Sequence, residues 1–257
     1  MSSPESAAPL GRRPIQSLAI IVQARMTSTR LPGKVLAPVL GRPMLAYQLE
    51  RLARVRTPHI TVVATTTNAS DDPIARLARE AGSHVFRGSE DDVLARYAGA
   101  AADVAARTVV RVTSDCPLID PAVIDRVIDR YAGGDCDYAS NTLVRTYPRG
   151  LDTEVLSVDT LAIAAREAID PVEREHVTPF VYRRPERFRL CSVESEVDLS
   201  RHRWTVDEAG DLAFVREVYE ALYSSMPDFG VDAVIELGRR RPDILGLNAG
   251  VRQKALS

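Results

Sequence analysis

Short apolar runs alternate with amphipathic stretches along the first half of the chain. Four runs have the length of strands, at residues 18–22, 60–64, 84–86 and 108–112. Between and after them, apolar side chains recur at helical spacing in stretches that begin near Pro43, Asp71, Asp91 and Pro121. The first run, LAIIV, is continuously apolar, which is typical of a strand buried on both faces. This alternation predicts an α/β fold with a Rossmann-like, doubly wound and mostly parallel sheet.

The pattern in the second half is less regular. Short strands are expected at residues 137–140, 153–156 and 188–193. Helices are expected over residues 158–168, 173–182 and 208–223, and near 235–239. We expect these elements to form a small α+β cap within one domain over residues 18–247, whose halves cover 18–135 and 136–225. The Pro-, Ser- and Ala-rich residues 1–17 are expected to be a disordered leader, and residues 248–257 a loose tail.

Composition excludes several classes of partner. The formal net charge is −2, so no global field attracts nucleic acid or a membrane, and any phosphate must bind to local clusters of Arg and Lys. No apolar run is long enough to span a bilayer. The cysteines, Cys116, Cys136 and Cys191, are odd in number and widely spaced, which gives no disulfide framework. Reduced thiols in a cytoplasmic protein are the simplest interpretation.

The loop after the first strand is the strongest candidate for chemistry. It covers residues 23–34, with the sequence QARMTSTRLPGK. Open α/β sheets bind ligands at the carboxyl ends of their strands, where the N–H groups of a loop can point at phosphate oxygens. Arg25, Arg30 and Lys34 would neutralise a triphosphate, and the Pro-Gly turn could direct Lys34 towards it. The glycine spacing matches neither a Walker A loop nor a dinucleotide fingerprint. A solvated basic loop is the alternative.

The segment TSDCP at residues 113–117 is a candidate metal site. It follows the fourth predicted strand, which lies beside the first strand in a doubly wound sheet, so Asp115 would face the basic loop. Mg²⁺ takes one or two carboxylates together with waters and substrate phosphates, which makes Asp115 our first candidate ligand. The alternative is an Asp that accepts hydrogen bonds from local N–H groups in a turn before Pro117.

Several segments together resemble a known family. QARMTSTRLPGKVLAPVLGRPML resembles the opening signature of the acidic-sugar cytidylyltransferases, and the likeness continues in VVATTTNASDDPIARLA, VFRGSEDDVLARY, VVRVTSDCPLIDP, YPRGLDTEV, EREHVTPFVYRRPE and RWTVDEAGDLAFV. It covers most of residues 20–223, and it is closest to the branch named for spore coat polysaccharide biosynthesis protein F. The family, which includes the acylneuraminate and 3-deoxy-manno-octulosonate enzymes, joins CMP from CTP to sugar acids and releases pyrophosphate.

The resemblance implies a sheet of the nucleotide-diphospho-sugar transferase type, Mg²⁺ as cofactor and a homodimer. The first half would bind the nucleotide, and the second would bind the acceptor and pair the subunits. Triphosphate contacts fall on Gln23, Ala24, Arg25, Ser28, Arg30, Lys34, Thr113 and Ser114. Cytosine contacts fall after the second and third strands, on Ala64, Thr65, Thr66, Gly88, Ser89 and Asp92. Asp207 matches the second carboxylate that binds the metal in this family, although it could instead cap the following helix. Glu208 is the fallback ligand.

Polar clusters in the cap are the candidates for the acceptor pocket. We select Tyr147, Arg149, Gly150, Glu154, His176 and Arg203 from among them. An Arg can hold a carboxylate or a phosphonate through two hydrogen bonds, so these residues suit a small anionic acceptor. His176 could equally be a histidine on a helix face without a function.

The predicted reaction is a cytidylyl transfer, with the catalytic residues Arg25, Arg30, Lys34 and Asp115. The acceptor oxygen attacks the α-phosphorus of CTP in line, and catalysis depends mainly on positioning and charge neutralisation. A phosphonate-specific cytidylyltransferase is the nearest alternative, and a nucleotidyltransferase for another base is a more distant one. A non-catalytic nucleotide-binding or scaffold protein is the alternative of another class. The joint presence of both carboxylates and both cations (Asp115, Asp207, Arg30 and Lys34) argues against that class.

Overall fold

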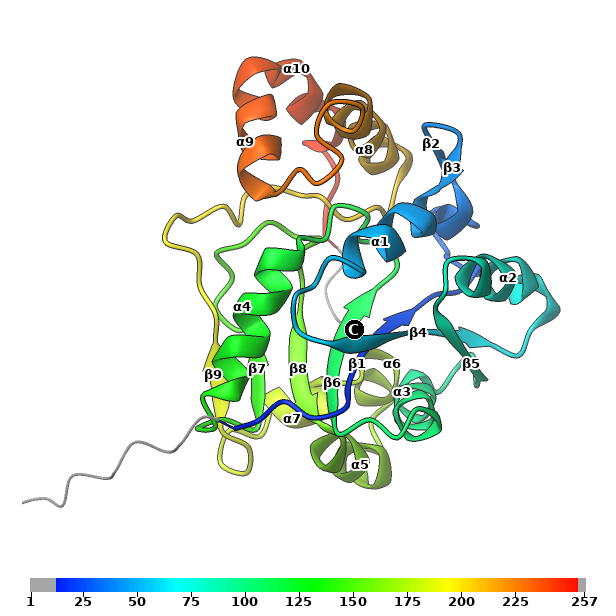
Figure 1. The fold of residues 1–257 in the computed structure, drawn as a ribbon, viewed down its shortest axis with the longest axis vertical. Helices are drawn as coiled ribbons and strands as arrows, with labels where there is room; N and C mark the ends of the chain where they lie inside the picture. The colour runs from blue at the N-terminus through cyan, green and yellow to red at the C-terminus, as the bar shows by residue number, and fades with distance from the viewer. Residues whose placement is uncertain (1–12, 254–257) are drawn as a thin grey trace, which may run out of the picture.

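A seven-stranded sheet forms the centre of the protein in the computed structural model, which describes residues 13–253 (Figure 1). The strands are β1 (Leu18–Gln23), β4 (His59–Thr66), β5 (His84–Gly88), β6 (Thr108–Thr113), β7 (Tyr138–Ser140), β8 (Glu154–Ser157) and β9 (Leu190–Ser192). Their order is β5-β4-β1-β6-β8-β7-β9. β8 runs antiparallel to both of its neighbours, and the other neighbouring pairs are parallel. The predicted mostly parallel α/β sheet is therefore confirmed.

Helices cover both faces of the sheet and one end of it (Figure 1). One face is covered by α1 (Met44–Leu52), α2 (Asp72–Glu80) and α4 (Pro121–Ala132). The other face is covered by α3 (Val93–Asp103), α5 (Val158–Glu167), α6 (Pro171–His176) and α7 (Pro179–Tyr182). A layer at one end contains α8 (Ala209–Leu222), α9 (Val231–Arg240) and α10 (Pro242–Leu245). Short elements complete the chain: η1 (Lys34–Leu36), β2 (Pro38–Val39), β3 (Arg42–Pro43), η2 (Ala69–Asp71) and η3 (Gly246–Asn248).

The continuous apolar run of β1 follows from its position between two helical layers. Leu18, Ile20 and Val22 pack with α1, α2 and α4. Ala19 and Ile21 point the opposite way and pack with α3 and α5. Successive side chains of a strand point to opposite faces of the sheet, so a strand covered on both faces needs apolar residues at every position.

The register of β1 brings three strand ends together. Gln23, its last residue, pairs with Ala64 of β4 on one side and with Thr113 of β6 on the other. The order of the strands along the chain reverses at β1, and a crevice opens beyond the carboxyl ends at such a point. The basic loop and the segment after Thr113 therefore face the same crevice, as the sequence predicted.

The helix predicted over residues 173–182 is in fact two short helices. α6 ends at His176, α7 begins at Pro179, and Val177 between them has φ 73° and ψ −59°. The N–H of Thr178 donates to the carbonyl of His176 at 2.9 Å, which closes a γ-turn of the rare, strained form with a positive φ. Pro179 has no N–H to continue a helix, so the helical spacing of the apolar residues is interrupted here.

The two ends of the chain are only partly described. Residues 1–12 of the predicted leader lie outside the described range, and Arg13 donates its backbone N–H to the carbonyl of Ala132 at 2.6 Å. The prediction of a loose tail does not hold at its start, because Asn248 is buried at 7% exposure. Residues 254–257 also lie outside the described range.

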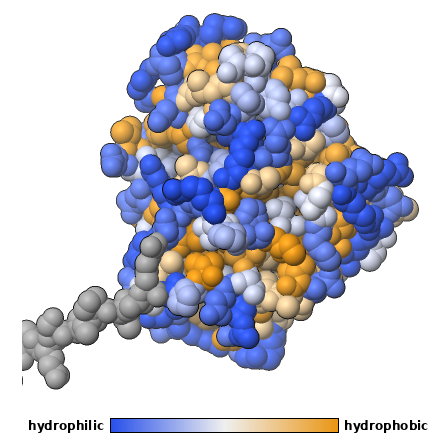
Figure 2. Space-filling view, viewed as in Figure 1, coloured by the Kyte–Doolittle hydropathy of each residue, from blue (hydrophilic) through white to orange (hydrophobic). Residues whose placement is uncertain are grey.

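The end layer has an aromatic core of its own. The rings of Tyr47 in α1 and Tyr219 in α8 lie 4.5 Å apart, and Tyr219 contacts Phe229 at 5.4 Å. Trp204 is buried in the same cluster, as expected of a packing residue. The face shown in Figure 2 mixes hydrophilic residues with smaller apolar groups. Within residues 13–253, the helices lack the combination of length and apolar character that crossing a membrane requires.

Candidate active site

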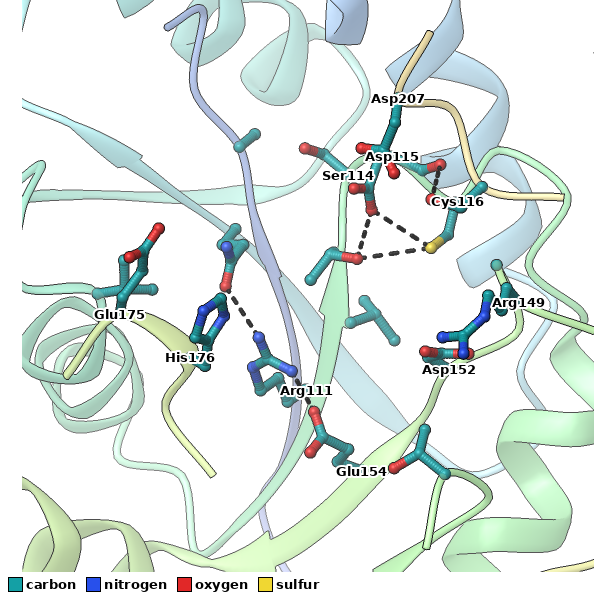
Figure 3. A pocket seen from close by; sticks show the side chains of 18 of the residues that line it. Arg111, Ser114, Asp115, Cys116, Arg149, Asp152, Glu154, Glu175, His176 and Asp207 are labelled. Atoms are coloured by element: carbon teal, nitrogen blue, oxygen red, sulfur yellow. Dashed lines mark hydrogen bonds and ion pairs between the residues drawn. The ribbon is translucent and has the colours of Figure 1, made fainter. Parts of the chain in front are cut away.

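A cavity of about 900 Å³ opens at the carboxyl ends of β1 and β6 (Figure 3). Its lining includes fourteen of the predicted site residues, namely Gln23, Ala24, Arg25, Ser28, Arg30, Lys34, Thr113, Ser114, Asp115, Arg149, Gly150, Glu154, His176 and Asp207. They come from the end of β1 and the basic loop, from the end of β6 and the residues just after it, and from the start of β8 and the segment before it. The end of α6 and the segment before α8 supply the others. Most of the residues selected from separate motifs therefore meet in one cavity.

Lys34 lies between the two predicted metal carboxylates. Its Nζ is 3.2 Å from Oδ2 of Asp115 and 2.9 Å from Oδ1 of Asp207. The same ammonium donates to the carbonyl of Val206 at 2.7 Å. Gly33 adopts φ 72° just before it, a left-handed conformation that glycine tolerates, and this turn directs Lys34 inwards. One cation can therefore contact two aspartates that are 92 positions apart in the chain.

The charges in this cluster support one another. Burial would lower the pKa of Lys34, but Asp115 and Asp207 outweigh it, and the pKa is raised. Burial would raise the pKa of Asp115, but Lys34 and the hydroxyl of Thr113 outweigh it, and the pKa is lowered. The ammonium and the Asp115 carboxylate are therefore both charged at neutral pH.

Asp207 is held by three cations. Besides Lys34, its Oδ2 accepts from Arg30 at 2.8 Å and from Arg203 at 2.7 Å. The N-cap of α8 is Glu208 and not Asp207, so the alternative interpretation of Asp207 as the cap is wrong. Glu208, the fallback ligand, pairs with Arg30 at 3.5 Å.

The bonds of Asp115 also argue against a turn-forming role. Its carboxylate contacts Lys34, accepts from the hydroxyl of Thr113 at 2.5 Å and lies 3.4 Å from the thiol of Cys116. Burial, followed by the charge of Asp115, raises the pKa of the Cys116 thiol well above its usual value. That thiol is therefore protonated at neutral pH, which is inconsistent with a nucleophilic role.

Asp71 anchors the basic loop, a role that the sequence did not reveal. Asp71 precedes the predicted helix in the position of an N-cap, but its side chain makes no capping bond to α2. Its carboxylate instead accepts from the backbone N–H of Met26 at 2.8 Å and from the hydroxyls of Thr65 at 3.2 Å and Thr66 at 2.6 Å. The loop after β1 is therefore tied to the end of β4 through a residue that is 1% exposed.

A buried polar network forms the floor of the cavity. Arg111 and Glu154 form an ion pair across β6 and β8, shown by a dashed line in Figure 3. Glu154 also accepts from the hydroxyls of Tyr138 and Thr178, each at 2.5 Å. Burial would lower the pKa of Arg111, but Glu154 outweighs it and raises the pKa, so this guanidinium stays charged. An Arg within the apolar run of β6 was the one sequence signal for this network, because a buried charge needs a partner.

The γ-turn at Val177 forms part of the wall opposite Asp115 and Asp207. His176 and Thr178, on either side of Val177, both line the cavity. A non-glycine residue in this conformation stores strain, on the order of 1–3 kcal/mol, and such residues cluster at functional sites. The bond from Thr178 to Glu154 and the burial of Val177 hold the turn in place.

Arg149 has a different environment from Arg111 and Arg145, which also line the cavity. Arg145 donates to both oxygens of Asp152, at 2.7 and 2.8 Å, and Arg111 is paired with Glu154. For Arg149 no ion pair or side-chain hydrogen bond occurs within residues 13–253. Its pKa is lowered by burial and then by Arg145, an effect that Asp152 only partly offsets and to which Arg203 adds. Arg149 is therefore a cation poorly compensated by its surroundings, facing the cavity.

Eight predicted site residues do not line this cavity: Ala64, Thr65, Thr66, Gly88, Ser89, Asp92, Tyr147 and Arg203. Thr65 and Thr66 donate hydrogen bonds from their hydroxyls to Asp71, as described above. Asp92 caps α3 and pairs with Arg174. The remaining members of the cytosine set lie at or near the ends of β4 and β5.

Two of these eight residues were predicted to contact the acceptor. Tyr147 is 2% exposed in the core of the end layer, where its hydroxyl accepts from Arg126 at 3.2 Å. Arg203 directs its guanidinium at Asp207 and at Asp211. The structure therefore gives both side chains contacts within the protein in place of the acceptor pocket.

Comparisons with known proteins show which family the chain resembles. A family model described as Cytidylyltransferase matches residues 19–222. The chain is 33% identical to an uncharacterized protein of Methanocaldococcus jannaschii, over 91% of this chain and 96% of that protein. It is 30% identical to the spore coat polysaccharide biosynthesis protein SpsF of Bacillus subtilis, over 89% of this chain and 97% of that protein. A solved cytidylyltransferase structure from Leptospira borgpetersenii superposes with a TM-score of 0.85 at 32% identity, covering 93% of this chain and 99% of that one.

Proposed function

Because the chain belongs to the cytidylyltransferase family and is therefore a nucleotidyltransferase, we propose that it transfers CMP from CTP to a small, polyhydroxylated monocarboxylic acid and releases pyrophosphate. The observation that carries this proposal is the position of Lys34, whose ammonium contacts both Asp115 and Asp207 beside the basic loop. A nucleoside triphosphate needs such cations near its phosphates, because its own charge repels an anionic acceptor.

The residues around Lys34 fit a divalent cation of the Mg²⁺ type. Asp115 and Asp207 both lie within 3.2 Å of one ammonium, so a single cation can contact both carboxylates. Mg²⁺ prefers oxygen ligands and usually combines one or two carboxylates with waters and substrate phosphates. When bound, it would neutralise charge at the α-phosphate and lower the pKa of the acceptor hydroxyl.

The other residues of the site would orient the two substrates. The N–H groups of the loop over residues 23–34, with Arg25 and Arg30, would hold the triphosphate so that its α-phosphorus faces the acceptor. Lys34 would offset the charge that builds on the departing pyrophosphate, without a protonation change, because its raised pKa keeps it charged. Asp115 and Asp207 hold Lys34, and they would also hold the cation when it is bound.

The charge balance around Arg149 favours a sugar acid over a phosphonate. Arg111 and Arg145 are already neutralised by Glu154 and Asp152, which leaves Arg149 to receive a negative group. One guanidinium matches one carboxylate through two hydrogen bonds. A phosphonate dianion would bring a second negative charge close to Asp152 and Glu154, whereas hydroxyl groups could donate hydrogen bonds to them.

Pyrophosphate release tests the proposal and its alternatives together. The protein is incubated with CTP and Mg²⁺ and with sugar acids, small phosphonocarboxylates or neutral sugars, and the same panel is repeated with UTP. We expect release with at least one sugar acid, at more than about tenfold the rate with any phosphonocarboxylate, since one unmatched charge is worth at least about 1.4 kcal/mol. Release with phosphonocarboxylates alone would reverse the acceptor assignment. CTP binding without release on any acceptor would favour a non-catalytic nucleotide-binding protein.

Replacing Asp71 with Asn is expected to raise the KM for CTP about tenfold. In Asn one of the two carboxylate oxygens becomes an NH2 group, which would face either the N–H of Met26 or the hydroxyl of Thr66. An unsatisfied buried donor costs about 1–3 kcal/mol. The basic loop would lose its anchor to β4. Steady-state kinetics and thermal melting measure the effect, with Asp72→Asn as the matched control, because Asp72 is adjacent and pairs with Arg87 at 2.6 Å on the surface. A lower Tm with an unchanged KM would show that Asp71 supports only the fold.

Two further expectations belong to the same proposal. The cysteines Cys116, Cys136 and Cys191 are all free and buried, which supports the proposed cytoplasmic location, where thiols stay reduced. The homodimer that the resemblance implies remains a proposal, and sedimentation equilibrium measures it directly.

A further inference from the structure

The chain beyond the matched family region returns to the active site. The match ends at residue 222, and α9, α10 and η3 follow it. In Figure 1 the red segment after α10 runs from the end layer back towards the sheet. Gln253 at the end of this segment lines the same cavity as Lys34 and Asp115.

Two side chains of this segment bind the arginine behind Asp207. Arg203 donates from Nη1 to Oε1 of Gln253 at 2.5 Å, and its carbonyl accepts from Nδ2 of Asn248 at 2.8 Å. Asn248 also donates to Oδ1 of Asp211 at 3.2 Å. The backbone and the side chain of Arg203 are therefore both held by residues 248–253.

Arg203 and Asp211 in turn fix the position of Asp207. Arg203 donates to Oδ2 of Asp207 at 2.7 Å and to Oδ1 of Asp211 at 2.9 Å. Oδ2 of Asp211 accepts from the backbone N–H groups of Asp207 at 2.9 Å and of Glu208 at 3.0 Å. Asp211 is 0% exposed, so its carboxylate oxygens depend on these donors for their hydrogen bonds. Arg203 therefore holds the side chain of Asp207 on the side away from Lys34, and Asp211 holds its backbone.

The approach of the segment to α8 depends on a glycine. A Cβ atom on Gly210 would lie 2.5 Å from the carbonyl oxygen of Leu247, which is closer than real contacts allow. The first turn of α8 therefore accommodates η3 only because residue 210 has no side chain.

We propose that residues 246–253 are part of the active site, in which Asn248 and Gln253 act as positioning residues for the Asp207 carboxylate through Arg203 and Asp211. This inference rests on the proposed function of Asp207 as a ligand of the divalent cation. A carboxylate ligand whose supporting bonds are lost typically binds its cation about 10–100-fold more weakly.

The test measures cation affinity separately from catalysis. Mn²⁺ binding to the full-length protein is followed by electron paramagnetic resonance, and kcat, the KM for CTP and the Mg²⁺ requirement are followed by pyrophosphate release. The variants are Asn248→Ala and Gln253→Ala. The matched control is Asn141→Ala, because Asn141 is 1% exposed and its side chain binds the backbone of Leu151 and Thr153, not Arg203, Asp207 or Asp211.

We expect Asn248→Ala to weaken Mn²⁺ binding about tenfold and to lower kcat, with recovery at high Mg²⁺ and little change in the KM for CTP. Gln253→Ala should show a smaller loss of the same kind. Asn141→Ala should lower the Tm and leave Mn²⁺ affinity unchanged. If Asn248→Ala matches Asn141→Ala in every measurement, the inference is wrong. If the wild-type protein transfers no CMP but Asn248→Ala still weakens Mn²⁺ binding, the positioning role stands and the proposed reaction fails.

Discussion

Replacing Asp115 with Asn is expected to lower kcat for pyrophosphate release about a thousandfold, while the Tm changes by less than about 3 °C. The carboxylate contacts Lys34 and lies beside the basic loop, so its loss would remove one of the two anionic ligands proposed for the cation. A thousandfold loss corresponds to about 4 kcal/mol, which is within the range expected when charge stabilisation by a bound cation is lost. The fold should persist, because Asp207 still compensates Lys34.

The control for this variant is Asp228→Asn, the same change at an exposed position in the loop before α9. It should leave kcat and the Tm unchanged. A kcat for Asp115→Asn within about threefold of the wild-type value would show that Asp115 takes no part in the reaction.

Replacing Lys34 with Met is expected to lower both catalysis and stability. The ammonium is 8% exposed and separates two carboxylates that would otherwise repel each other. Breaking a fully buried ion pair costs about 3–5 kcal/mol, and the partial exposure of Asp115 reduces this to about 2 kcal/mol, or about 4–8 °C in Tm. Loss of a cation at the departing pyrophosphate should lower kcat about 100-fold or more. Melting curves in metal-free buffer measure the loss of Tm, and pyrophosphate release measures the loss of kcat.

Lys34→Arg separates charge from shape at this position. It keeps the positive charge, so it should recover part of the Tm, but the planar guanidinium cannot replace a compact ammonium between Asp115 and Asp207, and kcat should stay low. Added Mg²⁺ should raise the Tm of Lys34→Met more than that of the wild-type protein, since a cation that binds the folded state stabilises it. An unchanged Tm for Lys34→Met in metal-free buffer would contradict the proposed arrangement of charges.

The sequence was sufficient to predict the sheet and the residues at its switch point. Strands buried on both faces have apolar residues at every position, and the order of the first and fourth predicted strands follows from a general rule of open sheets. The sequence alone therefore assigns Asp115, Arg30 and Lys34 to one crevice. The position of Asp207 beside them came from the family resemblance alone, because no local pattern distinguishes it from a helix cap.

The supporting residues could not be predicted, because their roles depend on partners distant in the chain. Asp71 precedes an amphipathic stretch and has the pattern of an N-cap, yet its carboxylate binds Met26 and Thr66. Arg203 follows other basic residues and suggested an anion site, yet it contacts Asp207 and Asp211. In each case the local pattern permits two roles, and only the packing of separate segments decides between them.

Asp115 and Asp207 are proposed to form one cation site beside Lys34 and the basic loop. Electron paramagnetic resonance of Mn²⁺, with and without CTP, tests it most directly in the wild-type protein and in Asp115→Asn and Asp207→Asn. We expect one Mn²⁺ per chain, tighter binding with CTP, and at least about tenfold weaker binding in both variants. Equal Mn²⁺ affinity in all three proteins would contradict it.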